Sequence, residues 1–138
     1  MQYKPIKTAI VGAGRAGWGM QCTELDRRAE RFTVAGGCDT YEPWRVRFSE
    51  RYPSAFVTDS LDDVLARPEI ELVSIATRSA DHYAHAMKAL GAGKLVFLEK
   101  PMCSTYEQAV ALRDASRRGP GTLYVRHNRR FEPGFREV

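Results

Sequence analysis

Three glycines and one acid have a spacing that suits the binding of a ligand with a pyrophosphate bridge. Gly12, Gly14 and Gly17 follow the pattern G-x-G-x-x-G, and Asp39 follows Gly17 by about the 20 residues that this pattern requires. The first glycine permits a tight turn, the second lets the backbone approach a pyrophosphate, and the third lets a helix pack on a strand. These residues predict a dinucleotide-binding turn. An ordinary structural turn, with Asp39 as a helix-capping acid, is the alternative.

Arg15 and Ala16 follow the second glycine at the expected start of a helix. Their free N–H groups would face the pyrophosphate, with the positive end of the helix dipole behind them. Asp39 can accept hydrogen bonds from both hydroxyls of the adenosine ribose. Its carboxylate would repel the 2′-phosphate of NADP, and neighbouring Thr40 brings no positive charge, so the sequence favours NAD. NADP stays open, because the long side chain of Arg45 could reach a 2′-phosphate.

Strands and helices that could position these residues alternate along the chain. Apolar runs rich in β-favouring residues predict strands at 7–11, 32–38, 55–57, 71–76, 95–98 and 122–125. This alternation is typical of a parallel sheet with helices on both faces. We therefore expect a three-layer, doubly wound α/β domain of the Rossmann type, with strand order 3-2-1-4-5-6.

Helical signals fill the intervals between these runs. The first helix is expected to bury an apolar stripe of four residues at helical spacing, namely Trp18, Cys22, Leu25 and Ala29. Further helices are expected at 42–51 before Pro53, briefly from Ser60, over 83–90 before Gly91 and Gly93, and after a capping box of Ser104 and Glu107.

Length and composition fit one globular domain of 138 residues, with 43% hydrophobic residues and a net charge of +4. No apolar run approaches the roughly 20 residues needed to cross a bilayer, and no apolar targeting segment is evident, so we expect a cytoplasmic protein with no membrane partner. Cys22, Cys38 and Cys103 form no C-x-x-C pair, and we expect buried, reduced thiols and no metal site.

Seven arginines lie between Arg113 and Arg136, which raises the question of nucleic-acid binding. They stand among Asp114, Glu132 and Glu137 with few aromatic residues between them. We therefore expect no nucleic-acid partner.

Two more segments have recognisable patterns. One runs Ser74-Ile75-Ala76-Thr77-Arg78-Ser79-Ala80-Asp81-His82, and the other is Glu99-Lys100-Pro101 at the end of the fifth strand. With the glycine turn and the tail Asn128-Arg129-Arg130-Phe131-Glu132-Pro133, they make nearly the whole chain resemble the glucose–fructose oxidoreductase, inositol dehydrogenase and MocA family. The resemblance implies oxidation or reduction of a secondary alcohol on a sugar, polyol or related ring, with hydride passing to or from C4 of the nicotinamide.

The resemblance also implies roles for individual residues. Lys100 matches the lysine that touches the reacting hydroxyl and helps to move its proton, and Glu99 matches the acid that fixes that lysine and the cofactor. Pro101 matches a residue that often follows a cis bond. A lysine at the carboxyl edge of a parallel sheet would also lie on the ligand side of the fold without any reference to the family; a solvated lysine paired with Glu99 is the alternative.

Ala76, Thr77, Arg78 and His82 complete the expected cofactor site. For His82, a hydrogen bond to the preceding loop is favoured over a role in chemistry. Arg78 departs from the family, which usually has proline after the threonine. The arginine could contact phosphate or substrate, or could belong to a looser loop.

The family carries its substrate on a second α/β domain, which we expect to be absent from these 138 residues. We expect residues 1–127 to form the NAD(P)-binding domain and 128–138 to begin the connection, with Pro133 to Val138 starting a helix. Such a chain would bind NAD(H) without turning over a substrate, and would self-associate through apolar surface near the sixth strand and the tail. A non-catalytic NAD(H) sensor and an S-adenosylmethionine methyltransferase are alternatives, which Glu99 and Lys100 argue against.

Overall fold

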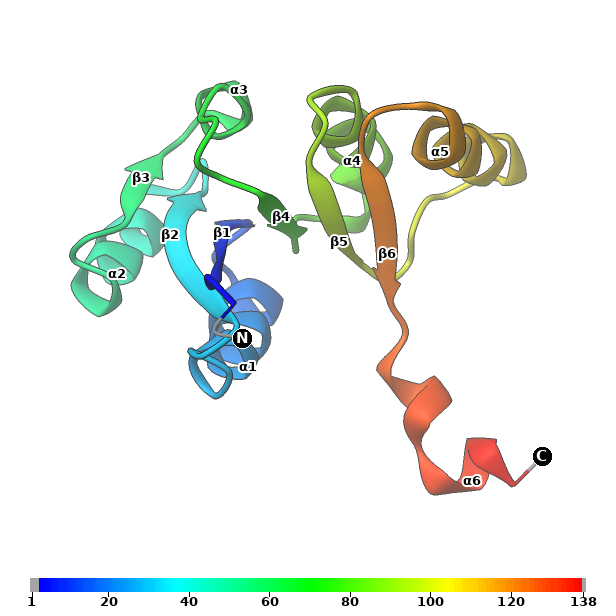
Figure 1. Cartoon of the computed structure of the whole chain (residues 1–138), viewed down its shortest axis with the longest axis horizontal. Coiled ribbons are helices and arrows are strands. Elements are labelled where there is room, and N and C mark those ends of the chain that lie inside the picture. The colour runs from blue at the N-terminus through cyan, green and yellow to red at the C-terminus, as the bar shows by residue number, and fades with distance from the viewer. Residues whose placement is uncertain (1–2, 138) are drawn as a thin grey trace.

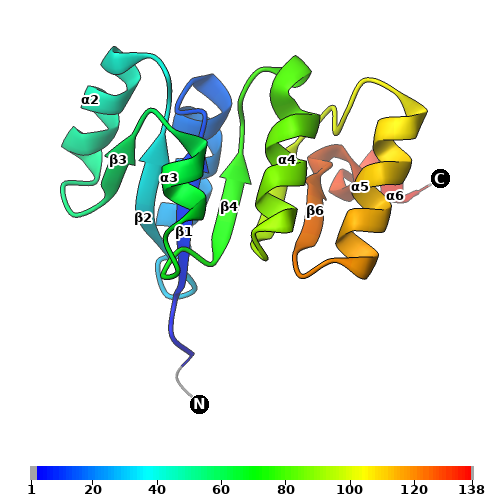
Figure 2. The same ribbon diagram turned by 90° about the horizontal axis from the view of Figure 1, so that it is seen from above.

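The computed structural model describes residues 3–137 and contains one six-stranded sheet between two layers of helices (Figures 1 and 2). The strands are β1 (Ile6–Val11), β2 (Phe32–Cys38), β3 (Phe56–Thr58), β4 (Leu72–Ile75), β5 (Leu95–Glu99) and β6 (Thr122–Arg126). All the pairings are parallel and the order is β3-β2-β1-β4-β5-β6, as predicted. Residues 1, 2 and 138 lie outside the described part, so the expected helix start is described only as far as residue 137.

Helices α1 and α2 lie on one face of the sheet, and α3, α4 and α5 lie on the other (Figure 1). The helical segments are η1 (Arg15–Gln21), α1 (Cys22–Asp26), α2 (Glu42–Arg51), α3 (Leu61–Leu65), η2 (Ser79–Asp81), α4 (His82–Gly91), α5 (Tyr106–Arg118), η3 (Asn128–Phe131) and α6 (Pro133–Arg136). The segments η3 and α6 extend from β6 away from the sheet (Figure 1).

Each face of the sheet has its own apolar core. The larger core joins β4 and β5 to α4 and α5, with fully buried residues such as Val73, Leu98 and Leu112. The smaller core joins β1 to α1 and α2 through Ile10 and Phe48 with their neighbours. Together they hold the strand ends that carry the predicted site.

The cysteine prediction is confirmed at two positions. Cys22 and Cys38 are buried, and burial raises the pKa of the Cys38 thiol to about 12, so this thiol stays protonated. Cys103 is only partly buried, because it lies in the loop before α5 rather than on a strand or helix face.

The first helix is shorter than its apolar stripe predicted. Trp18, Cys22 and Leu25 pack in the smaller core, but α1 ends at Asp26 and Ala29 is exposed. After α1 the chain turns through backbone hydrogen bonds, including Arg31 N–H to the carbonyl of Arg28 at 2.8 Å, and then enters β2. The segment η1 is a π-helix, in which the N–H of Cys22 reaches back to the carbonyl of Gly17.

The predicted capping box before α5 is wrong by one residue. Thr105, not Ser104, is the N-cap, and its hydroxyl accepts the N–H of Gln108 at 3.2 Å. The Gln108 side chain in turn accepts the N–H of Ser104 at 3.0 Å. The sequence offers two possible capping pairs, Ser104 with Glu107 and Thr105 with Gln108, and the structure uses the second pair.

An apolar groove of about 900 Å³ runs along the face of the sheet that carries α1, beside β4, β5 and β6. Leu72, Leu95, Phe97 and Leu123 line it, and Phe131 of the tail lies at its margin with 72% of its surface exposed. This is the region near the sixth strand and the tail where open apolar surface was expected.

Candidate cofactor site

A cleft of about 750 Å³ opens at the carboxyl ends of β1, β2 and β4, where the strand order reverses direction. Ligands of doubly wound sheets bind in this position. The cleft brings together seven residues singled out from the sequence, namely Gly12, Gly14, Asp39, Thr40, Ala76, Thr77 and Arg78. Two sequence patterns that lie far apart in the chain, the glycine turn and the segment after β4, thus meet at one site.

The three glycines of the turn differ in what a side chain at each position would meet. Gly12 has φ of +91°, and a Cβ there would come within 2.6 Å of the Ala76 carbonyl. A Cβ at Gly17 would overlap the carbonyl oxygen of Gly12. A Cβ at Gly14, by contrast, would meet nothing within 4 Å and would stand in open space at the cleft. Protein packing explains Gly12 and Gly17, whereas the bare backbone at Gly14 leaves room for a pyrophosphate, so the turn fits a dinucleotide.

Asp39 lies directly after β2, where its carboxylate bridges two backbone segments. One oxygen accepts the N–H of Ala13 in the glycine turn at 2.8 Å, and the other accepts the N–H of Tyr41 at 2.9 Å. The Arg45 guanidinium donates to the backbone carbonyls of Asp39 and Thr40 at 2.8 and 3.0 Å. A carboxylate and a guanidinium therefore both lie close to the end of β2.

Six of the predicted site residues do not line this cleft: Arg15, Ala16, Gly17, His82, Glu99 and Lys100. Arg15, Ala16 and Gly17 form the start of η1 directly after the turn. His82 is buried and joins two loops, with one ring nitrogen 2.7 Å from the carbonyl oxygen of Pro101 and the other 3.0 Å from that of Thr77. The expected hydrogen bond of His82 to the preceding loop is confirmed, and the Lys100–Pro101 bond is cis.

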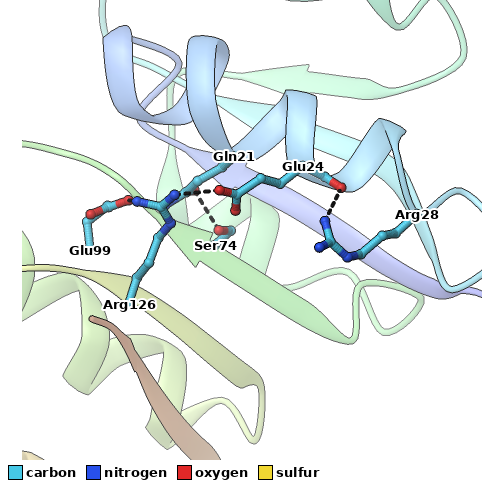
Figure 3. Close-up of polar contacts among 6 residues, drawn as sticks. All are labelled: Gln21, Glu24, Arg28, Ser74, Glu99 and Arg126. Atoms are coloured by element: carbon cyan, nitrogen blue, oxygen red, sulfur yellow. Dashed lines mark hydrogen bonds and ion pairs between the residues drawn. The ribbon is translucent and has the colours of Figure 1, made fainter. Parts of the chain in front are cut away.

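Glu99 and Lys100 end β5 with opposite exposures. Glu99 is 5% exposed, and its carboxylate accepts a hydrogen bond from Gln21 at 3.2 Å and pairs with Arg126 at 3.2 Å (Figure 3). Lys100 is exposed, and among the described residues it forms no ion pair with Glu99. The acid next to Lys100 is thus engaged by other side chains.

Arg78 keeps the backbone conformation of the proline that it replaces. Its φ of −65° and ψ of 146° are extended values that proline also adopts. The side chain is 88% exposed and pairs with Asp81 at 3.1 Å at the cleft wall. The Arg78 guanidinium thus stands at the cleft wall, where Asp81 is its partner.

The cleft also includes side chains that the sequence analysis did not select. Tyr41 and Trp44 come from the segment after β2, Leu61 comes from the segment after β3, and His85 comes from α4. Tyr41 and Leu61 could have been found from their positions, because each closely follows a strand whose carboxyl end lies at this edge of the sheet. His85 lies on a helix and has no such signal.

His85 is expected to make the stability of the fold depend on pH. Burial lowers the pKa of His85 below its ordinary value of 6.5, and its Nδ1 lies 3.1 Å from the Thr77 hydroxyl. Because the unfolded chain binds this proton more readily than the folded chain, the free energy of unfolding should fall as the pH drops below 6.5. Urea unfolding at about pH 7.5 and about pH 5.5 should show a larger loss for the natural chain than for His85→Gln. Equal losses in the two proteins would contradict this assignment.

Within residues 3–137, no three His, Cys, Asp or Glu side chains are grouped so that they could hold a metal ion. In the same part of the chain, no helix has the length and apolar character needed to cross a membrane.

Comparison with known proteins assigns the chain to a protein family. A family model described as an oxidoreductase family with an NAD-binding Rossmann fold matches residues 6–127. The chain belongs to this family. The resemblance to glucose–fructose oxidoreductase, inositol dehydrogenase and MocA proteins is thereby confirmed.

Three relatives illustrate the family. The scyllo-inositol 2-dehydrogenase (NADP(+)) of Bacillus subtilis strain 168 is 40% identical over 84 residues, which are 61% of this chain and 24% of that enzyme. The D-glucoside 3-dehydrogenase of Escherichia coli K12 is 32% identical over 94% of this chain and 37% of the enzyme. The WlbA dehydrogenase of Chromobacterium violaceum, solved in complex with NADH and UDP-GlcNAcA, has a TM-score of 0.91 at 26% identity over 99% of this chain. The chain spans between 24% and 39% of the length of these relatives.

Proposed function

We propose that this chain is the nicotinamide-dinucleotide-binding part of an oxidoreductase acting on a secondary alcohol of a sugar, polyol or related ring. The observation that carries the proposal is the bare Gly14 backbone at a cleft that also holds Asp39. The names of the inositol and glucoside dehydrogenases support the substrate class. The bound nicotinamide would accept or supply the hydride.

Within this proposal, the chain's own residues bind the cofactor in three groups. The turn from Gly12 to Gly17, with the N–H groups of Arg15 and Ala16, would hold the pyrophosphate. Asp39 and Thr40 would hold the adenosine ribose. The remaining contacts, Ala76, Thr77, Arg78, His82, Glu99 and Lys100, would lie along the path toward the nicotinamide. Lys100, exposed at the end of β5, would exchange a proton with the reacting hydroxyl.

The preference between NAD and NADP should depend on two side chains with opposite charges. Asp39→Ala is expected to weaken NADH binding by about tenfold, because the ribose hydroxyls lose a charged acceptor worth about 1.5 kcal/mol. Arg45→Ala is the matched control and should leave NADH affinity within about twofold while weakening NADPH. Trp44 lines the cleft, so the quenching of its fluorescence measures both affinities. Undiminished NADH binding by Asp39→Ala would contradict the ribose role.

We further propose that residues 1–127 are the cofactor-binding domain and that 128–138 begin a connection to a substrate domain. The greater length of the relatives supports this division. On this proposal the 138-residue chain binds NAD(H) without dehydrogenase turnover, and a saturable rate with any sugar or polyol would argue against it. The apolar groove beside β6 supports self-association, which a strictly monomeric sizing profile would contradict.

A further inference from the structure

A line of polar side chains joins the segment after the glycine turn to three strands of the sheet (Figure 3). The Ser74 hydroxyl on β4 donates to the Gln21 side chain at 2.6 Å, and the Gln21 amide donates to Glu99 on β5 at 3.2 Å. Arg126, the last residue of β6, pairs with Glu99 at 3.2 Å through one nitrogen and with Glu24 of α1 through another. Five elements of the fold are connected through these five residues.

This line is largely removed from solvent. The exposed fractions are 1% for Gln21, 2% for Ser74, 5% for Glu99 and 8% for Arg126. Burial acts to lower the pKa of the Arg126 guanidinium, but hydrogen bonding and charge from Glu24 and Glu99 outweigh it and raise that pKa. Arg126 therefore stays charged, and Glu99 has a permanent cation as its partner.

A buried ion pair of this kind contributes little net stability to a fold, because removing both charges from water costs free energy. Apolar residues of similar volume often stabilise the fold as well. The particular effect of the ion pair is on geometry, since a carboxylate held by two donors on different elements has little freedom to reorient. Gln21 and Arg126 both donate to the same oxygen of Glu99, Oε1, one from η1 and one from β6. They fix the residue that directly precedes Lys100.

The position of Glu99 indicates which half of a dinucleotide this line would influence. Asp39, Tyr41 and Leu61 lie at the ends of β2 and β3, on one side of β1 in the sheet. Glu99 and Arg126 end β5 and β6, on the other side of β1. A dinucleotide crosses the carboxyl edge with its halves on either side of the glycine turn. An adenosine half at Asp39 would leave the nicotinamide half toward Glu99.

We propose that Arg126 is a positioning residue for the nicotinamide half of the cofactor, acting by holding Glu99 in place beside Lys100. This inference rests on the proposed function, because it requires that the cleft binds a nicotinamide dinucleotide. No local pattern marks the arginine, since it lies far along the chain from both Glu99 and Glu24. The pairing of β5 with β6 sets Arg126 directly opposite Glu99.

The test compares two ligands that differ in the nicotinamide half. NADH and ADP are titrated into the 138-residue chain and into Arg126→Met, with Trp fluorescence as the readout. Arg126→Met should lower the affinity for NADH by about tenfold, because the charged contact that holds Glu99 is lost. The affinity for ADP should stay within about twofold of the natural value. Arg126→Lys, which keeps a cation near Glu99, should recover part of the NADH affinity. The control is Arg28→Met, which removes the same charge from an exposed residue of the neighbouring turn and should change neither affinity.

Arg126→Met leaves the buried Glu99 carboxylate without its cation, which can destabilise the fold. A second comparison separates this effect from positioning. In a Glu99→Gln background there is no buried carboxylate to hold, so Arg126→Met should cause no further loss of NADH affinity. Equal losses of NADH and ADP affinity, unchanged NADH affinity in Arg126→Met, or a further loss in the Glu99→Gln background would each overturn the positioning role alone. A natural chain that binds ADP but not NADH, or neither, would overturn the proposed function and this inference with it.

Discussion

Gly14→Val is expected to abolish NADH binding while leaving the stability of the chain close to that of the natural protein. The Gly14 backbone has φ of −75° and ψ of −157°, which is extended and lies outside the left-handed region that favours glycine. Apart from Gly14 itself, its two chain neighbours and the nearby helix backbone, no heavy atom of the described residues lies within 4 Å of the position that a Cβ would occupy. The added methyl groups would instead occupy the space beside the turn that a pyrophosphate needs. We expect a loss of at least about a hundredfold in affinity, or about 2.7 kcal/mol.

Gly19→Val provides the matched control for this substitution. Gly19 is also in the segment that follows the turn, and a Cβ there would likewise meet nothing within 4 Å. It is exposed and does not line the cleft, so NADH affinity should stay within about threefold of the natural value. If Gly14→Val bound NADH as tightly as Gly19→Val, the turn would not be the pyrophosphate site.

Phe48→Ala is expected to cause the largest loss of stability among single substitutions near the site. Phe48 is 1% exposed and is the buried residue through which α2 packs on the sheet. A Cβ at Gly37 of β2 would come within 2.5 Å of its ring, which shows how closely the helix approaches the strand. Truncating a buried phenylalanine costs about 3–5 kcal/mol, a large part of the roughly 5–15 kcal/mol that stabilises a domain.

Urea unfolding followed by circular dichroism measures this loss. Val46→Ala is the control on the same helix, since Val46 is 52% exposed and should change the free energy of unfolding by less than about 0.5 kcal/mol. Because α2 begins directly after the segment that Asp39 holds through the Tyr41 N–H, the Phe48 variant should also lose NADH affinity. A destabilisation below about 1 kcal/mol would show that α2 does not depend on this packing.

The sheet and the turn were predictable because several local signals agreed. The strand runs around β1, β2 and β5 are apolar and β-favouring, and turns or helix caps bound them, which leaves few alternatives to a parallel sheet. The spacing of the three glycines and Asp39 follows from the size of a ligand rather than from the core. The strand order and the cleft around Gly14 and Asp39 therefore agree with the expectation.

The contacts of Glu99 were not predictable in the same way. Gln21 and Arg126 look like ordinary polar residues in the sequence, and only the register of β5 with β6 and the π-helical path of η1 bring them to Glu99. Local degeneracy caused the smaller errors: Ser104 and Thr105 can each cap a helix, and the apolar stripe ran on to Ala29 beyond the turn that ends α1. Long-range pairing and competition between adjacent residues are the missing information.

Calorimetric titration of the 138-residue chain with NADH, alongside NADPH and S-adenosylmethionine, tests most directly whether the cleft binds a nicotinamide dinucleotide. We expect saturable binding of about one NADH per chain, weaker binding of NADPH, no heat from S-adenosylmethionine, and loss of the NADH signal in Gly14→Val. Binding of S-adenosylmethionine in place of NADH, or no binding of either nicotinamide dinucleotide, would contradict this expectation.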